Sequence, residues 1–144
     1  MIQGMFDTGA MPALERLVQF TAQRHKLIAH NVANVSTPGF RPRDLDPTDF
    51  QRSLGEAIDR RRQLTGGPNG ELRVGDTSQL SFTDESIELK PGFADENILF
   101  HDRNNRSLEH LMQGLAENAM THNMALEMMR NQFQMMQVAI RERV

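Results

Sequence analysis

Five histidines are the side chains of this sequence best suited to bind a metal ion, and their spacing argues against a shared site. They are His25, His30, His101, His110 and His122. His25 and His30 are five residues apart, so they do not share one face of a helix. None of the five fits a ligand pattern such as His-Glu-x-x-His. The absence of cysteine excludes thiolate sites and disulfides. We expect no metal site and no cofactor.

Three carboxylates, Asp44, Asp46 and Asp49, lie close together in the sequence. Hydrolases and transferases use such groups as general acids and bases. Here no candidate nucleophile, glycine-rich phosphate loop or suitably spaced histidine accompanies them. We therefore predict that the chain is not an enzyme, has no catalytic residues and takes no small-molecule substrate.

A group of arginines raises the question of nucleic-acid binding. The group comprises Arg41, Arg43, Arg52, Arg60, Arg61 and Arg62. The chain carries a formal net charge of -3, which gives no overall attraction to nucleic acid. We interpret them as a solvated face, or as a contact with an acidic neighbouring subunit, and expect no nucleic-acid partner.

The elements that would position these side chains are helices, and the longest is predicted over residues 107–144. Apolar residues recur there in alternating steps of four and three, which is typical of a helix that packs along a partner helix. The positions are Leu108, Met112, Leu115, Ala119, His122, Leu126, Met129, Phe133, Met136 and Ile140. Ser107 is expected to cap the helix. At about 1.5 Å per residue the helix is too long to form one side of a compact globule.

The same helix carries a second apolar stripe at Met120, Met124, Met128, Met135 and Val138. A helix that is apolar on two faces needs partners on both. We expect this stripe to contact other subunits, since the unbranched Met side chain adapts to imperfectly matched surfaces. The alternative is a Met-rich helix within an ordinary bundle.

An N-terminal helix is predicted from Pro12 to about Val35, with its own seam. Its seam residues are Leu14, Val18, Thr21, His25, Ile28, Val32 and Val35. A stripe of Leu17, Phe20 and Leu27 lies beside the seam and is expected to bind neighbours. The two seams predict that the first and last helices pack against each other in antiparallel orientation.

The expected fold class is mainly α, with long N- and C-terminal helices packed as a coiled-coil-like rod and an irregular central insert. Residues 1–11 are interpreted as a flexible leader. Residues 12–40 and 107–144 form one domain, and residues 41–106 form the central region. Thr48 and Gln51 match a capping box, which predicts a short helix near 48–64.

The stretch from His30 to Phe40 is the most specific motif in the chain. It reads His-Asn-Val-Ala-Asn-Val-Ser-Thr-Pro-Gly-Phe. Asn31 and Asn34 can bond to backbone groups that a helix leaves free at its end, and Pro38 and Gly39 stop the helix. An ordinary helix stop without functional meaning remains the alternative interpretation.

This motif resembles the N-terminal signature of the bacterial flagellar rod, hook and hook-filament axial proteins. The matching residues are Asn31, Ala33, Asn34, Thr37, Pro38, Gly39 and Phe40. The following Arg43-Asp44 pair, Phe50 and the late Leu-Ala-Glu-Asn over Leu115–Asn118 are most similar to the proximal rod member of that family. The resemblance covers roughly residues 12–58 and 105–143.

The resemblance implies a structural subunit that polymerises into the proximal part of the periplasmic rod, which transmits torque from motor to hook. It implies that the partners are other copies of the chain, other rod and basal body proteins and the flagellar type III export apparatus. Export by that route needs no cleaved signal peptide, and none is recognisable in the sequence. No run is apolar enough to span a bilayer, so no direct membrane insertion is expected. The competing hypothesis is a soluble helical adaptor or export chaperone that binds one partner through its Met-rich helix.

Overall fold

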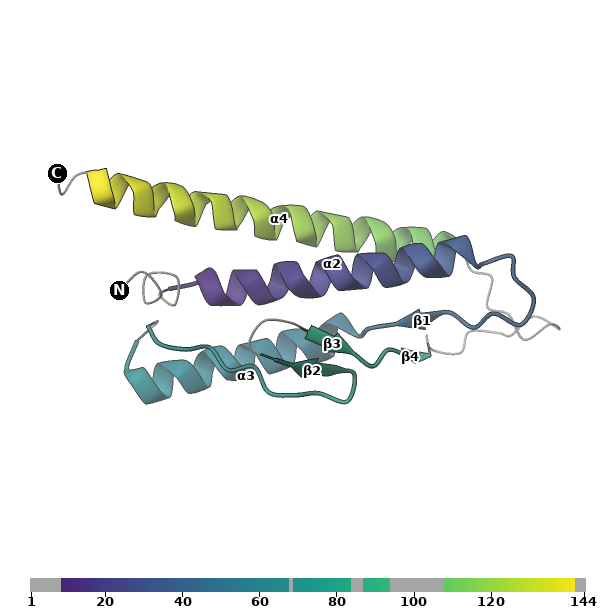
Figure 1. Ribbon diagram of the computed structural model, residues 1–144, viewed down its shortest axis with the longest axis horizontal. Coiled ribbons are helices and arrows are strands. Elements are labelled where there is room, and N and C mark those ends of the chain that lie inside the picture. Colours follow the sequence, from purple (N-terminus) through teal and green to yellow (C-terminus); the bar gives the residue numbers. More distant parts are fainter. Residues whose placement is uncertain (1–8, 68, 84–86, 94–107, 142–144) are drawn as a thin grey trace.

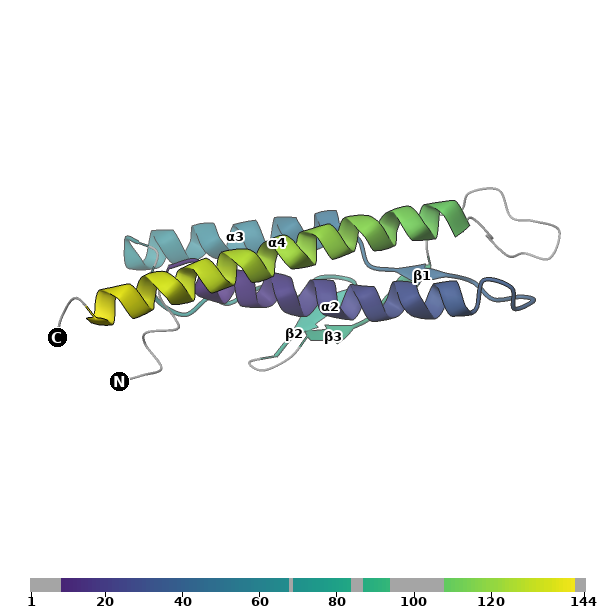
Figure 2. The same cartoon turned by 90° about the horizontal axis from the view of Figure 1, so that it is seen from above.

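The computed structural model describes residues 9–67, 69–83, 87–93 and 108–141, and its architecture is mainly α. Three helices lie side by side along one long axis: α2 (Met11–Ala33), α3 (Pro47–Thr65) and α4 (Leu108–Arg141). Figure 1 shows α2 between the levels of the other two, with α3 and α4 both antiparallel to it, and Figure 2 shows α2 displaced to one side of them. The expected mainly α fold with long terminal helices is confirmed.

Two small antiparallel strand pairs accompany the helices. Strand β1 (Arg43–Asp44) pairs with β4 (Gly92–Phe93), and β2 (Leu80–Phe82) pairs with β3 (Ile87–Leu89). Two-stranded ribbons have little stability of their own in water. They depend on the helices against which they lie.

Helix α2 begins and ends where its sequence predicts within two residues. Pro12 lies in its first turn, where a missing amide proton is tolerated. At the other end the Asn34 side chain donates a hydrogen bond to the His30 carbonyl oxygen at 2.8 Å, which satisfies one of the free carbonyls. Gly39 then takes a φ of 74°, a left-handed conformation that favours glycine.

Helix α3 corresponds to the helix expected near 48–64, but a different residue caps it. The carboxylate of Asp46 accepts a hydrogen bond from the Thr48 amide at 2.8 Å, so Asp46 is the N-cap. The expected capping box began at Thr48, two residues later. At the C-terminus Gly66 has a φ of 68°, and its amide donates to the Arg62 carbonyl oxygen at 2.9 Å.

The hydrophobic core lies between α2 and α3 and is closed by β2 and β3. Its buried members are Phe20, Leu45, Phe50, Leu80 and Ile87. The rings of Phe20 and Phe50 are parallel, with centroids 4.1 Å apart. Leu17, Leu27 and Leu54 pack against this cluster from its edges. The core is therefore on the face of α2 that points away from α4.

Helix α4 packs along the opposite face of α2 and buries little of its own surface. Among its described residues only Asn118 and Ala125 are buried. Ala125 has no exposed surface, because its small side chain lets the two backbones approach closely. The yellow C-terminal end of α4 extends past the start of α2 in Figure 1. Most of α4 is therefore exposed in the single chain.

Some expectations fall outside the described residues. They are the leader over residues 1–8, the Ser107 cap and the part of the central region over residues 94–106. None of the described helices is long and apolar enough to cross a membrane.

Candidate assembly surface and the polar contacts behind it

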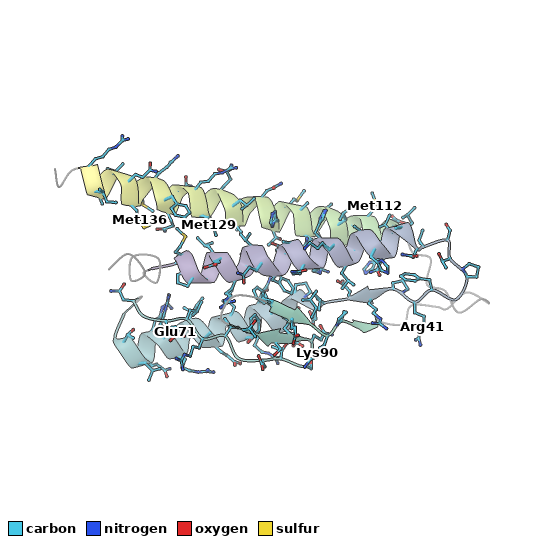
Figure 3. The ribbon with its side chains drawn as sticks, in the orientation of Figure 1. Arg41, Glu71, Lys90, Met112, Met129 and Met136 are labelled. Carbon is cyan, nitrogen blue, oxygen red and sulfur yellow. The ribbon has the colours of Figure 1, made fainter. Side chains whose placement is uncertain are left out.

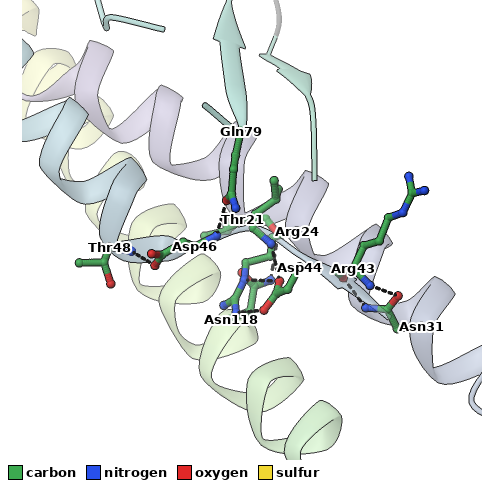
Figure 4. A network of polar contacts seen from close by, with 10 residues as sticks. Thr21, Arg24, Asn31, Arg43, Asp44, Asp46, Thr48, Gln79 and Asn118 are labelled. Atoms are coloured by element: carbon green, nitrogen blue, oxygen red, sulfur yellow. Dashed lines mark hydrogen bonds and ion pairs between the residues drawn. The ribbon is translucent and has the colours of Figure 1, made fainter. Parts of the chain in front are cut away.

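A bidentate ion pair joins α2 to the strand that follows the signature turn. Arg24 donates from Nε to Asp44 Oδ1 at 3.1 Å and from Nη2 to Asp44 Oδ2 at 2.7 Å. The same carboxylate accepts the Leu45 amide at 2.8 Å. Figure 4 shows these contacts at the junction of α2 and β1. The planar guanidinium holds a carboxylate in one orientation, so this pair fixes β1 against α2.

Asn31, about two turns further along α2, fixes the same strand, whereas it was expected to bond to backbone groups at the end of its own helix. Its side-chain Nδ2 donates to the Arg43 carbonyl oxygen at 2.5 Å, and its Oδ1 accepts the Arg43 amide at 3.2 Å. One buried side chain thus satisfies both backbone groups of Arg43, as a neighbouring strand would. The chain is clamped as it returns from the signature turn (Figure 4).

The remaining signature residues form the turn itself. Phe40 packs edge-on against His30 with ring centroids 5.7 Å apart, and it is half-buried. The Phe40 amide donates to the Thr37 carbonyl oxygen at 3.1 Å, and Ala33, Thr37 and Pro38 are exposed. The turn therefore combines two internal anchors, Asn31 and Phe40, with an exposed tip.

Two polar contacts join α2 to α4. Asn118 donates from Nδ2 to the Thr21 carbonyl oxygen at 2.9 Å, and both residues are buried. The Thr21 hydroxyl lies 2.9 Å from the Leu17 carbonyl oxygen and 2.8 Å from His122 Nδ1. The Thr21 hydroxyl therefore links the backbone of α2 to the His122 ring of α4.

The expected seam residues divide by exposure. On α2, Leu14 and Ile28 are buried, while Val18 and Val32 are half-buried. On α4, the half-buried members are Leu115, Leu126, Met129 and Met136, and the exposed members are Leu108, Met112, Phe133 and Ile140. Figure 3 shows Met129 and Met136 on the side of α4 that faces α2.

The residues of α4 that face α2 are shifted around the helix axis relative to the expected seam. It runs through Leu111, Asn118, Ala125 and Gln132, alternating with half-buried seam positions such as Leu115 and Met129. The steps are still four and three, so the period was sufficient to predict a packed helix. The rotation follows from Asn118 and Ala125, a polar and a small residue that an apolar count passes over.

The residues expected to contact neighbours also divide. Phe20 is only 3% exposed and lies in the core, which differs from the expected role because α3 covers this face of α2 within the same chain. Leu17 and Leu27 are half-buried beside it. The four methionines expected to contact neighbours from α4, by contrast, are between 43% and 72% exposed. They are Met120, Met124, Met128 and Met135, and we call them the methionine stripe.

Exposed apolar residues continue to the end of α4. Phe133, Val138 and Ile140 are 40%, 54% and 50% exposed. Phe133 and Ile140 are seam positions on the other side of the helix, whereas Val138 continues the methionine stripe along its own face. Contiguous apolar surface of this kind marks interaction sites in soluble proteins.

The ionisable side chains near this surface form no metal-binding group in the described part of the chain. Within the described ranges no three His, Asp or Glu side chains are grouped closely enough to hold a metal ion. The pKa of the Glu71 carboxyl is lowered by a hydrogen bond from the Arg73 guanidinium at 2.9 Å and by its charge. That pair is fully exposed on the central region, remote in sequence from the helix contacts.

The described residues form an elongated helical protein with an exposed apolar face, and the similarity found is to a flagellar basal body rod protein. The particular relative is the flagellar basal body rod protein FlgB of Salmonella typhimurium, to which the chain is 38% identical over 53 residues. The match spans 37% of this chain and 36% of FlgB. No family model matches the chain. The similarity supports the resemblance to rod proteins at this coarse level.

Proposed function

We propose that this chain is a structural subunit of the bacterial flagellar basal body, and that it polymerises into the proximal part of the periplasmic rod. The rod transmits torque from motor to hook. The observation that carries the proposal is the methionine stripe, a row of exposed apolar side chains on the helix with the fewest buried residues among those described. The signature at residues 31–40 and the similarity to FlgB support it.

In this proposal the stripe and the apolar end of α4 bind neighbouring subunits. Those neighbours are other copies of the chain and other rod and basal body proteins. Each large apolar side chain that becomes fully buried contributes about 1.5–3 kcal/mol relative to exposure. Four methionines in one row therefore supply a substantial part of the energy that one subunit contact needs.

The polar contacts behind the surface have a mechanical role. Arg24 and Asn31 both hold the strand that follows the signature turn, so the turn cannot pivot freely against α2. Asn118 and His122 set the register of α4 on α2. A subunit that transmits torque needs such fixed angles, because flexible contacts between its elements would deform under load.

The proposed export route and cellular location follow from the resemblance to rod proteins. The flagellar type III apparatus exports the chain without a cleaved signal peptide, and the chain acts in the periplasmic part of the basal body. Its role is structural, with no enzymatic activity. The name of the relative FlgB, a rod protein, agrees with this.

The second candidate is a soluble helical adaptor or export chaperone. The methionine stripe also fits an adaptor or chaperone, because flexible Met-rich surfaces bind single protein partners as well. An adaptor would form a small complex of fixed size in the cytoplasm. A rod subunit would enter a sedimentable envelope structure.

Cell fractionation separates the two candidates. An epitope-tagged chain, expressed in a strain that lacks the native gene and restored to motility, would be followed through cytoplasmic, periplasmic and detergent-insoluble envelope fractions. The rod proposal predicts that the chain sediments with the envelope structure. A chain confined to a small soluble complex would contradict it.

A further inference from the structure

Methionine sulfur is the group in this chain that peroxides oxidise most readily, because the sequence has ten methionines and no cysteine. Eight of the ten lie in the described residues, and seven of these are on α4. The methionine stripe and Met112 are exposed, Met129 and Met136 are half-buried, and Met11 is only 6% exposed. The accessible sulfur of the described chain therefore lies on α4, and most of it belongs to the stripe.

We propose that the methionine stripe is a site of reversible oxidation by hydrogen peroxide, and that oxidation there keeps the chain from assembling. The effect on assembly rests on the proposed function, whereas the oxidation itself does not. A sulfur lone pair attacks one peroxide oxygen, so that an S–O bond forms and the O–O bond breaks. The sulfur loses two electrons, the second oxygen leaves as water with both protons, and the side chain becomes a methionine sulfoxide.

The exposed fractions of the side chains rank the sites in the free chain. Within the stripe they fall from 72% at Met120 to 43% at Met128. Figure 3 shows Met129 and Met136 on the side of α4 that faces α2, where the neighbouring helix restricts access to their sulfurs. Because the oxidant must reach a sulfur to react with it, the stripe should be oxidised first and Met11 last.

A sulfoxide changes what the stripe can bind without disturbing the fold of the chain itself. Its oxygen is polar and stays hydrated while the side chain is exposed, as all four stripe residues are in the single chain. When a neighbour covers the side chain, the oxygen must give up its hydrogen bonds to water, which is costly unless a donor replaces them. A methionine sulfoxide reductase can reach an exposed sulfoxide and restore the thioether. Oxidation therefore excludes a chain before assembly, and reduction returns it.

Peptide mass spectrometry of the purified full chain, treated with hydrogen peroxide for increasing times, tests the site directly. Met120 and Met124 are expected to form sulfoxide at least about fivefold faster than Met11, because the oxidant reaches them without unfolding of the chain. The circular dichroism of the oxidised chain should keep its helical signal. Equal rates at Met11 and at the stripe, or loss of helix as the stripe oxidises, would overturn the proposal.

A variant that resembles the sulfoxide tests the effect on assembly. Glutamine is a polar side chain of similar length that favours the helix, so Met120→Gln combined with Met124→Gln imitates two oxidised positions. In a strain that lacks the native gene, this double variant should enter hook–basal bodies at least about tenfold less than the native chain. Met112→Gln makes the same change at an exposed position of α4 outside the stripe and should enter them at the native level. Incorporation of the double variant at the native level would overturn the proposed effect.

The native chain from peroxide-treated cells provides a test that needs no variant. Its sulfoxide content at Met120 should be at least about threefold lower in hook–basal bodies than in the chains outside them, because oxidised chains are left out. Equal sulfoxide contents would overturn the effect on assembly. Absence of the native chain from hook–basal bodies would contradict the proposed function and the effect on assembly together, while the oxidation measured on the purified chain would stand.

Discussion

Asn118 on α4 and Thr21 on α2 are joined by a buried hydrogen bond of 2.9 Å, from the Asn118 side-chain amide to the Thr21 backbone carbonyl. A buried amide can occupy that place only in one register of the two helices. The bond therefore fixes the axial position of α4, which the small apolar contacts along the helix would leave less defined.

Asn118→Ala is predicted to destabilise the free chain by about 1–2 kcal/mol, because a buried hydrogen bond is lost and a small cavity is left. Urea unfolding monitored by circular dichroism measures the change. Asn123→Ala, at an exposed position of the same helix, is the control and should change stability by less than about 0.5 kcal/mol. Equal effects at the two positions would show that Asn118 does not fix the helix pair.

The ion pair between Arg24 and Asp44 is predicted to show measurable coupling. A double-mutant cycle with Arg24→Gln and Asp44→Asn should give a coupling free energy of about 1–2 kcal/mol. The pair is bidentate, and the Arg24 side chain is 10% exposed. Part of the effect is screened through Asp44, which is more exposed. The surface pair Arg130 and Glu127 should give about 0.5 kcal/mol or less in the same assay. The prediction fails if the two cycles give the same value.

Gly114→Ala is predicted to stabilise α4 by about 0.5–1 kcal/mol, because alanine favours the helix and the new methyl group meets no atom within 4 Å. The position borders a hollow of about 120 Å³ between α2 and α4, lined also by Arg24, Ile28 and Glu117. Gly66→Ala is the counterpart and should cost about 1 kcal/mol, since Gly66 has a φ of 68°. Thermal unfolding of both variants tests the two predictions. Tm should rise in Gly114→Ala and fall in Gly66→Ala.

Met124→Asp is predicted to block assembly and motility while leaving the fold intact. The side chain is 57% exposed in the free chain, so the charge is tolerated there and becomes costly only when a neighbour covers it. Circular dichroism of the purified variant and a swarming assay of the complemented strain measure the two effects. Gln51→Asp introduces the same charge at an exposed position on α3, outside the proposed contact, and should swim normally. Normal swimming by Met124→Asp would remove the stripe from the proposed contact.

The sequence was sufficient to predict the long helices. The four-three period of α4, the stop at Pro38 and Gly39, and the bond from Asn34 to a carbonyl at the helix end are local signals. Each of these depends on residues close together in the chain. Local patterns therefore determined most of the helical architecture.

Three features depended on contacts distant in sequence and were not predicted. The stripe on α2 indicated a partner, but only the stacking of Phe20 on Phe50 showed that α3 fills that role. The rotation of α4 depends on Asn118 and Ala125, which an apolar pattern does not count. Arg61 appeared to belong to a surface charge run, and only the fold shows that it is buried. The period of apolar residues shows that one face of a helix is covered, but it does not show which element covers that face.

The central claim is that this chain is part of the flagellar rod, and quantitative mass spectrometry of purified hook–basal bodies from the source cells tests it most directly. The account predicts that the chain is present in these particles at a few copies each. Detection only in the soluble cytoplasmic fraction, with hook–basal bodies complete without it, would contradict the account and favour the adaptor.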